Sequence, residues 1–128
     1  SILLHEAARP LVTFDAFRKL VDICYDNVTY GIRIPFTVLE GTNNITGILD
    51  RDKLLNIQLP QKFSREDLLK CHELARLNGD TFTEDASMIV TYLDKTVHVL
   101  EGSEFNIKIT TPLDMMLSET ILEERLLR

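Results

Sequence analysis

The chain has 128 residues and a formal net charge of −6 at pH 7, and 45% of its residues are hydrophobic. This composition is typical of a folded globular domain, and the negative charge argues against nucleic acid or an anionic membrane as a partner, because both require a basic patch. No apolar run approaches the roughly 20 residues that a membrane-spanning helix needs. Cys24 and Cys71 lack the short spacing of metal ligands or redox pairs, so we expect two core thiols inside helices and a cytoplasmic protein.

The first half of the chain predicts a strand, a helix and a hairpin. The strand is expected at residues 2–4, and Thr13 or Asp15 can cap a helix that continues to Cys24. Residues 28–39 alternate between apolar and polar as an extended segment does, and turn residues separate them from a second extended stretch at 45–48. We therefore expect a protruding β-hairpin arm over roughly residues 34–55.

The second half predicts two strands and three helices. The strands are expected at residues 97–100 and 105–109, and the helices are expected to begin after Ser64, at residues 83–85, and after Thr110 or Thr111. Before them, a compact apolar segment at residues 54–59 is expected to stop at Pro60, and Pro112 is expected to occupy the first position of the last helix.

Strands that alternate with helices predict a parallel α/β sheet with helices on both faces, in which ligands bind at the carboxyl ends of the strands. Three polar clusters lie at predicted strand ends or helix starts: Glu6 with Arg9, residues 83–87, and residues 108–111. An arginine there can bind phosphate while a carboxylate faces a cation or a sugar hydroxyl. The spacing of Glu6 and Arg9 alone equally allows an ordinary strand-to-helix turn.

Five motifs carry a stronger signal when they are taken together. They are HEAARP at 5–10, LDR at 49–51, LPQKF at 59–63, TEDAS at 83–87 and EGSEFNIKITTPLD at 101–114. In this order they resemble motifs of the 2-C-methyl-D-erythritol 4-phosphate and ribitol-5-phosphate cytidylyltransferases. The whole of residues 1–128 resembles the C-terminal part of that single domain. The resemblance implies a Rossmann-like three-layer sandwich whose N-terminal nucleotide-binding half lies outside these residues.

The resemblance also implies a reaction, a cofactor and an assembly. CTP and a polyol phosphate would give a CDP-alcohol and pyrophosphate in the presence of Mg²⁺ or another divalent cation. The polyol phosphate would be methylerythritol 4-phosphate, a substrate of isoprenoid biosynthesis, or a pentitol phosphate such as ribitol 5-phosphate. The protein would be a homodimer in which the arm of one subunit completes the substrate pocket of the other. Such a transfer relies on positioning and charge neutralisation, without a nucleophilic Ser or Cys.

The motifs assign catalytic roles to Glu6 and Lys108. Glu6 stands where the family has Asp, so the resemblance makes it a catalytic carboxylate and the expected metal ligand. Lys108 would neutralise the α-phosphate of CTP, and Arg9 would bind the polyol phosphate. Read without the motifs, Glu6 is a first-turn acid of a helix and Lys108 a solvated surface charge.

The remaining substrate-binding residues, Thr37, Arg51 and Thr83, are assigned in the same way. Arg51 would reach the polyol phosphate across the dimer, and Thr83 would hydrogen-bond the polyol, although it could also be an ordinary helix cap. Thr37 stands in Phe36-Thr37-Val38-Leu39, where the erythritol enzymes have D-T-x-K. The loss of the acidic and basic side chains makes a pentitol phosphate a credible substrate.

The family's Gly-rich loop, which binds the triphosphate through backbone donors, is not among these 128 residues. We therefore expect this chain by itself to be inactive and the full-length protein to be the enzyme. Two alternatives stay open: another sugar-phosphate nucleotidyltransferase, and a non-catalytic dimerisation module derived from the same fold.

Overall fold

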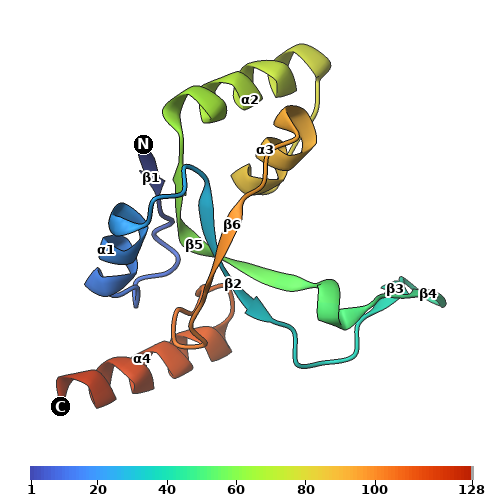
Figure 1. Ribbon diagram of the computed structural model, residues 1–128. Helices are drawn as coiled ribbons and strands as arrows, with labels where there is room; N and C mark the ends of the chain where they lie inside the picture. The colour runs from blue at the N-terminus through green and yellow to red at the C-terminus, as the bar shows by residue number, and fades with distance from the viewer. Residues whose placement is uncertain (128) are drawn as a thin grey trace.

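Four strands form one mixed sheet in the computed structural model, which describes residues 1–127 (Figure 1). The strands of this sheet are β1 (Ile2–Leu4), β5 (Leu55–Phe63), β2 (Val28–Arg33) and β6 (His98–Glu101), in that spatial order. The helices are α1 (Phe14–Asp22), α2 (Arg65–Asn78), α3 (Asp85–Leu93) and α4 (Pro112–Leu126). The arm contains β3 (Leu39–Gly41), β4 (Ile45–Ile48) and the short 3-10 helix η1 (Arg51–Lys53).

The expected parallel sheet is wrong in its strand directions. β5 runs antiparallel to both β1 and β2, and only the β2–β6 pair in the described sheet is parallel. The arm explains this, because it returns the chain beside β2 as a long hairpin and thereby reverses β5. The α/β class is nevertheless confirmed, because one mixed sheet lies between helices on its two faces.

Helices pack on both faces of the sheet, as expected. On one face, Leu20 of α1 packs against Val28 and Tyr30 of β2. On the other face, Phe63 of β5 packs with Cys71 of α2 and with further apolar residues of α2 and α3. Two separate apolar clusters therefore hold the sheet between its helices.

Local sequence signals define the helix ends. Ser64 caps α2 by accepting a hydrogen bond from the Asp67 N–H, and Gly79 ends that helix in the left-handed conformation at φ 72°. Thr111 and Asp114 form a capping box at the start of α4, and Pro112 occupies its first turn. Hydrogen bonds from the backbone N–H of Thr110, and then from Thr111 and the Thr110 hydroxyl, hold the pKa of Asp114 at about 2.

Three expectations about the strands and cysteines are wrong. β5 continues through Pro60, which follows a cis peptide bond, and ends only at Phe63. Residues 105–109 form a loop, although their apolar alternation is typical of a strand. Cys24 lies beyond the end of α1 and is exposed, whereas Cys71 is buried within α2 as expected.

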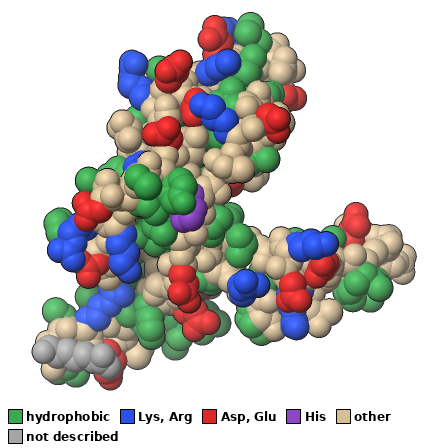
Figure 2. All heavy atoms as spheres, in the orientation of Figure 1, with side chains coloured by type: hydrophobic (Ala, Val, Ile, Leu, Met, Phe, Trp, Pro, Cys, Tyr) green, Lys and Arg blue, Asp and Glu red, His purple; other side chains and the backbone are tan. Residues whose placement is uncertain are grey.

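The arm projects away from the sheet and helices, as the hairpin pattern predicted (Figures 1 and 2). β3 and β4 pair as an antiparallel hairpin at its end. The expected extended segment is interrupted, because β2 ends at Arg33 and residues 34–38 lie outside any strand. Within residues 1–127, no helix combines the length and apolar character that a membrane crossing would require.

Truncation of Phe63 should destabilise the fold far more than truncation of an exposed phenylalanine. Phe63 is fully buried between β1, α2 and α3, whereas the side chain of Phe14 is 80% exposed. We expect Phe63→Ala to lower the free energy of unfolding by about 3–5 kcal/mol and Phe14→Ala by less than about 0.5 kcal/mol, measured by urea denaturation. Equal losses would contradict the packing described here.

Candidate active site

The turn that follows β1 places Glu6 and Arg9 close together. The backbone N–H of Arg9 donates to the Glu6 carbonyl oxygen over 3.1 Å, and His5 Nε2 donates to the Arg9 carbonyl oxygen over 3.1 Å. His5 therefore stabilises the turn through this hydrogen bond. The segment that contains Glu6 and Arg9 is therefore both the turn and the charged site that the sequence allowed.

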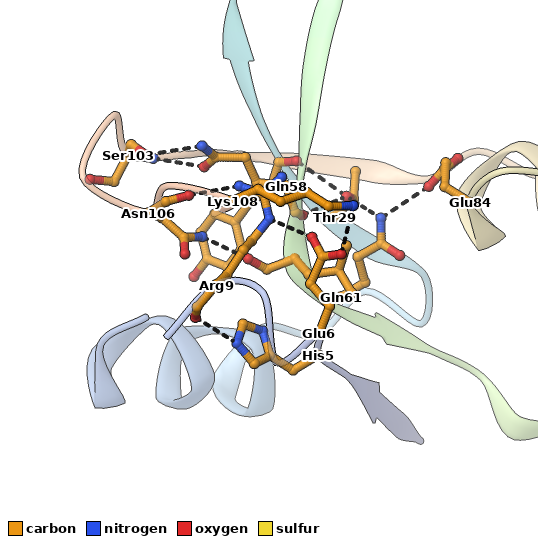
Figure 3. Close-up of polar contacts among 12 residues, drawn as sticks. His5, Glu6, Arg9, Thr29, Gln58, Gln61, Glu84, Ser103, Asn106 and Lys108 are labelled. Carbon is orange, nitrogen blue, oxygen red and sulfur yellow. Dashed lines mark hydrogen bonds and ion pairs between the residues drawn. The ribbon is translucent and has the colours of Figure 1, made fainter. Parts of the chain in front are cut away.

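Glu6 joins two cations that are distant in sequence (Figure 3). Its Oε1 accepts a hydrogen bond from Arg9 Nε over 2.7 Å, and its Oε2 lies 2.9 Å from Lys108 Nζ. Burial of the carboxyl opposes ionisation, but the hydrogen bonds and charges of Lys108 and Arg9 outweigh it and hold the pKa of Glu6 below its ordinary value. Glu6 is therefore ionised at neutral pH.

The two cations differ in exposure. The Arg9 side chain is 9% exposed, and its Nη1 donates to the Asn106 carbonyl oxygen over 2.7 Å. The Lys108 side chain is 48% exposed, and only one of the three ammonium protons is needed for Glu6. Lys108 is thus the cation best able to contact a bound anion.

Thr83 lies beside a second cluster of polar side chains, which contains Glu84 and Gln61. The N-cap of α3 is Glu84 and not Thr83, because the Glu84 carboxylate accepts from the backbone N–H groups of Ala86 and Ser87. Glu84 Oε2 also accepts from Gln61 Nε2 over 3.0 Å. The exposed Thr83 therefore precedes a carboxylate that is fixed to the sheet, and the alternative role of Thr83 as the helix cap is wrong.

The structure does not bring Thr37 and Arg51 to Glu6 within the same chain. Both are exposed residues of the arm, which points away from the sheet (Figure 1). Arg51 donates from Nη1 to the Pro35 carbonyl oxygen over 3.2 Å, so its described contact lies at the base of the arm.

Sequence reasoning missed three buried amides near the site. Gln58, Gln61 and Asn106 are all at least nine-tenths buried. Gln58 is hydrogen-bonded to the loop before α4, Gln61 to β2 and to the N-cap of α3, and Asn106 to β5. Gln61 and Asn106 stand inside the matched motifs but received no role. The sequence feature that could have identified them is a polar side chain at a position where the protein interior normally holds an apolar one.

Comparison with known proteins identifies the family. The model of the family "IspD: 2-C-methyl-D-erythritol 4-phosphate cytidylyltransferase" matches residues 1–124. This chain belongs to the IspD family. The resemblance found in the five motifs is thereby confirmed.

Individual IspD relatives are considerably longer than this chain. The 2-C-methyl-D-erythritol 4-phosphate cytidylyltransferase of Acaryochloris marina is 38% identical over 98% of this chain and 54% of its own length, and that of Dictyoglomus thermophilum is 39% identical over 96% and 55%. The crystal structure of the enzyme of that name from Thermus thermophilus has a TM-score of 0.82 and 26% identity, and this chain covers 61% of it. The chain spans about half the length of the curated relatives it matches.

The described residues do not form a metal site by themselves. Each Glu6 oxygen already accepts a hydrogen bond from a cation, and residues 1–127 hold no group of three or more His, Cys, Asp or Glu side chains arranged to bind a metal ion. Mg²⁺ prefers oxygen ligands and often takes several of them from substrate phosphates. Glu6 is the carboxylate that the sequence motifs assigned to the metal.

Removal of the Glu6 charge should lower the free energy of unfolding more than removal of an exposed carboxylate that also pairs with an arginine three residues later. We expect Glu6→Gln to lower the free energy of unfolding by about 2–3 kcal/mol, because the buried Arg9 guanidinium loses its counter-charge. Asp15→Asn, which breaks the exposed i,i+3 pair with Arg18, should cost less than about 1 kcal/mol. Chemical denaturation of both variants measures the difference, and equal costs would contradict the role of Glu6 as the counter-charge of the buried Arg9.

Proposed function

We propose that this chain forms the alcohol-phosphate-binding part of a cytidylyltransferase that couples CTP to 2-C-methyl-D-erythritol 4-phosphate. Membership of the IspD family and the names of the relatives support this assignment. The observation that carries it is the convergence of Arg9 and Lys108 on the Glu6 carboxylate. Cations brought together from two separate motifs are suited to the phosphates of two substrates.

The proposed reaction is a phosphoryl-type transfer. A phosphate oxygen of the alcohol phosphate forms a bond to the α-phosphorus of CTP, and the bond between that phosphorus and the oxygen bridging to the β-phosphate breaks. The electron pair leaves with pyrophosphate. The half-exposed Lys108 ammonium has N–H donors to offer to the α-phosphate, where negative charge accumulates in the transition state.

In this proposal Glu6 orients the catalytic lysine and Arg9 contributes to the alcohol-phosphate site. Arg9 Nε and Nη1 are already engaged by Glu6 and the Asn106 carbonyl oxygen. A phosphate would therefore be bound by the remaining N–H groups of this nearly buried guanidinium. Thr83, exposed beside the fixed Glu84, is proposed to donate to a hydroxyl of the alcohol.

We also propose a homodimer in which the arm supplies Thr37 and Arg51 to the site of the second copy. The arm exposes apolar side chains, with Phe36 74%, Ile45 72% and Ile48 86% exposed. Contact with another subunit would remove this surface from water.

Sedimentation velocity of the natural full-length protein should give a dimer, and Ile45→Ser with Ile48→Ser should shift it toward monomer. A monomeric wild-type protein would overturn this part of the proposal.

A pentitol phosphate such as ribitol 5-phosphate is the second candidate substrate. Phe36 and Leu39 flank Thr37 where the erythritol enzymes have Asp and Lys, and Phe36 is largely exposed. An apolar side chain in place of an ionic one removes polar contacts to the alcohol and so favours a differently shaped polyol. The support for this second substrate comes from residues of the arm alone.

A divalent cation and a cytoplasmic location complete the proposal. The cation would take most of its oxygen ligands from the nucleotide phosphates, with Glu6 as the carboxylate proposed from this chain. Since both Glu6 oxygens already have cationic partners, no step of the reaction is assigned to the metal here. The cytoplasmic location is supported by two cysteines without metal or redox spacing.

The proposal is tested by measuring pyrophosphate release by the natural full-length protein with CTP and each candidate alcohol phosphate. We expect turnover with 2-C-methyl-D-erythritol 4-phosphate. Turnover only with ribitol 5-phosphate would transfer the assignment to the second substrate. Turnover only with other nucleotides or sugar phosphates would indicate another nucleotidyltransferase, and no turnover with any of them would indicate a non-catalytic dimerisation module.

The two cations should differ in kinetic effect. Arg9→Ala should raise KM for the alcohol phosphate about tenfold or more, because the guanidinium is proposed to bind this phosphate in the ground state as well as in the transition state. Lys108→Ala should instead lower kcat about 100-fold, because its charge acts where charge develops. Lys19→Ala, an exposed lysine of α1, is the matched control and should leave both constants near wild type. Equal, small effects of Arg9→Ala and Lys108→Ala would count against these roles.

A further inference from the structure

The segment that carries Lys108 has no regular secondary structure. Residues 102–111, between β6 and α4, belong to no helix or strand, and Lys108 itself is exposed. A lysine on such a segment would sample many positions unless the backbone beside it were fixed. The contacts of this loop with the sheet therefore decide how well Lys108 is placed.

Gln58 of β5 fixes the start of the loop (Figure 3). Its Nε2 donates to the Ser103 carbonyl oxygen over 2.9 Å, and its Oε1 accepts from the Ser103 N–H over 3.0 Å. The side-chain amide thus pairs with the Ser103 backbone through both its donor and its acceptor, as a neighbouring strand would. Gly102 makes this approach possible, because a Cβ there would collide with Gln58 Oε1.

Asn106 fixes the middle of the loop. Its Nδ2 donates to the Leu59 carbonyl oxygen over 2.7 Å, so a second side-chain amide joins the loop to β5. Its backbone carbonyl oxygen accepts from Arg9 Nη1 over 2.7 Å, two residues before Lys108. The Oδ1 atom of this nearly buried side chain has no hydrogen-bond partner among the described residues, a cost that an apolar residue would avoid.

The end of the loop is joined to the turn that carries Glu6 and Arg9. The Ile109 N–H donates to the Ala8 carbonyl oxygen over 2.8 Å. From this anchored backbone the Lys108 side chain reaches Glu6 Oε2. Each third of the loop is therefore attached to β5 or to the turn after β1.

We propose that Gln58 and Asn106 are positioning residues, whose side-chain amides fix the loop of residues 102–109 to β5 and thereby place the Lys108 ammonium against Glu6. This inference rests on the proposed role of Lys108 in cytidylyl transfer. Two buried amides are an unfavourable way to fill the interior, since apolar side chains would pack there without a desolvation cost. What they provide instead is a fixed position for the reacting charge.

The kinetic test uses Gln58→Met and Asn106→Ala in the natural full-length protein. Each should lower kcat about tenfold while KM for CTP changes less than about threefold, because a mobile Lys108 still allows binding. In a Lys108→Ala background the same substitutions should lower kcat less than about twofold further. Glu104→Ala, an exposed residue of the same loop, is the matched control and should leave kcat near wild type. The same fold-loss in both backgrounds would overturn the proposal.

Hydrogen–deuterium exchange gives a readout that does not require activity. We expect Gln58→Met to accelerate exchange of the Ser103 and Ile109 amides at least about tenfold while the amides of α2 stay protected. Gly102→Ala is a second variant, which displaces the Gln58 amide without removing a hydrogen-bonding group, and should have the same effect. Unchanged exchange at Ile109 in both variants would overturn the positioning role, whereas a wild-type protein that releases no pyrophosphate would overturn only the proposed function.

Discussion

The carboxylate of Glu6, shared between a guanidinium and an ammonium, is the interaction on which the arrangement of the site depends. Arg9 is buried, and a buried guanidinium without a counter-charge would be strongly destabilising. Glu6 supplies that charge with one oxygen and keeps the second for Lys108. The turn after β1 and the loop before α4 are thus joined electrostatically, and the exposed Lys108 is ordered by its contact with Glu6.

The same part of the molecule contains an unusual share of buried polar groups. Gln61 donates to Thr29 and to Glu84, while Gln58 and Asn106 hold the loop before α4. Networks of this kind contribute little net stability, but satisfied hydrogen bonds restrict the geometry more narrowly than apolar packing does. The apolar clusters around Leu20 and Phe63 lie on the two faces of the sheet. They bury the apolar surface that stabilises the fold, which the polar site does not provide.

The arm differs from the sheet and helices in how it places its apolar side chains. It is anchored at its base, where β2 and β5 leave the sheet, and it exposes large apolar side chains along its length. Substrate-binding residues assigned to it by the IspD resemblance do not reach Glu6 within one chain. In the proposed homodimer the arm would meet the site of the second copy, and differences at Phe36 and Leu39 would alter the proposed substrate without disturbing the fold.

The sequence by itself determined the family, the motif residues, both ends of α2 and the start of α4, since caps such as Ser64, Gly79 and Thr111 act through hydrogen bonds within a few residues. Tertiary structure decided the strand directions, the passage of β5 through Pro60 and the loop at residues 105–109. Apolar alternation is not enough to identify a strand, because hydrogen-bond partners decide whether a segment joins the sheet. In this loop the apolar Phe105 is 60% exposed and the polar Asn106 is buried. For this loop the partners are Gln58, Leu59 and Ala8, which lie tens of residues away in sequence and become neighbours only when the sheet has formed.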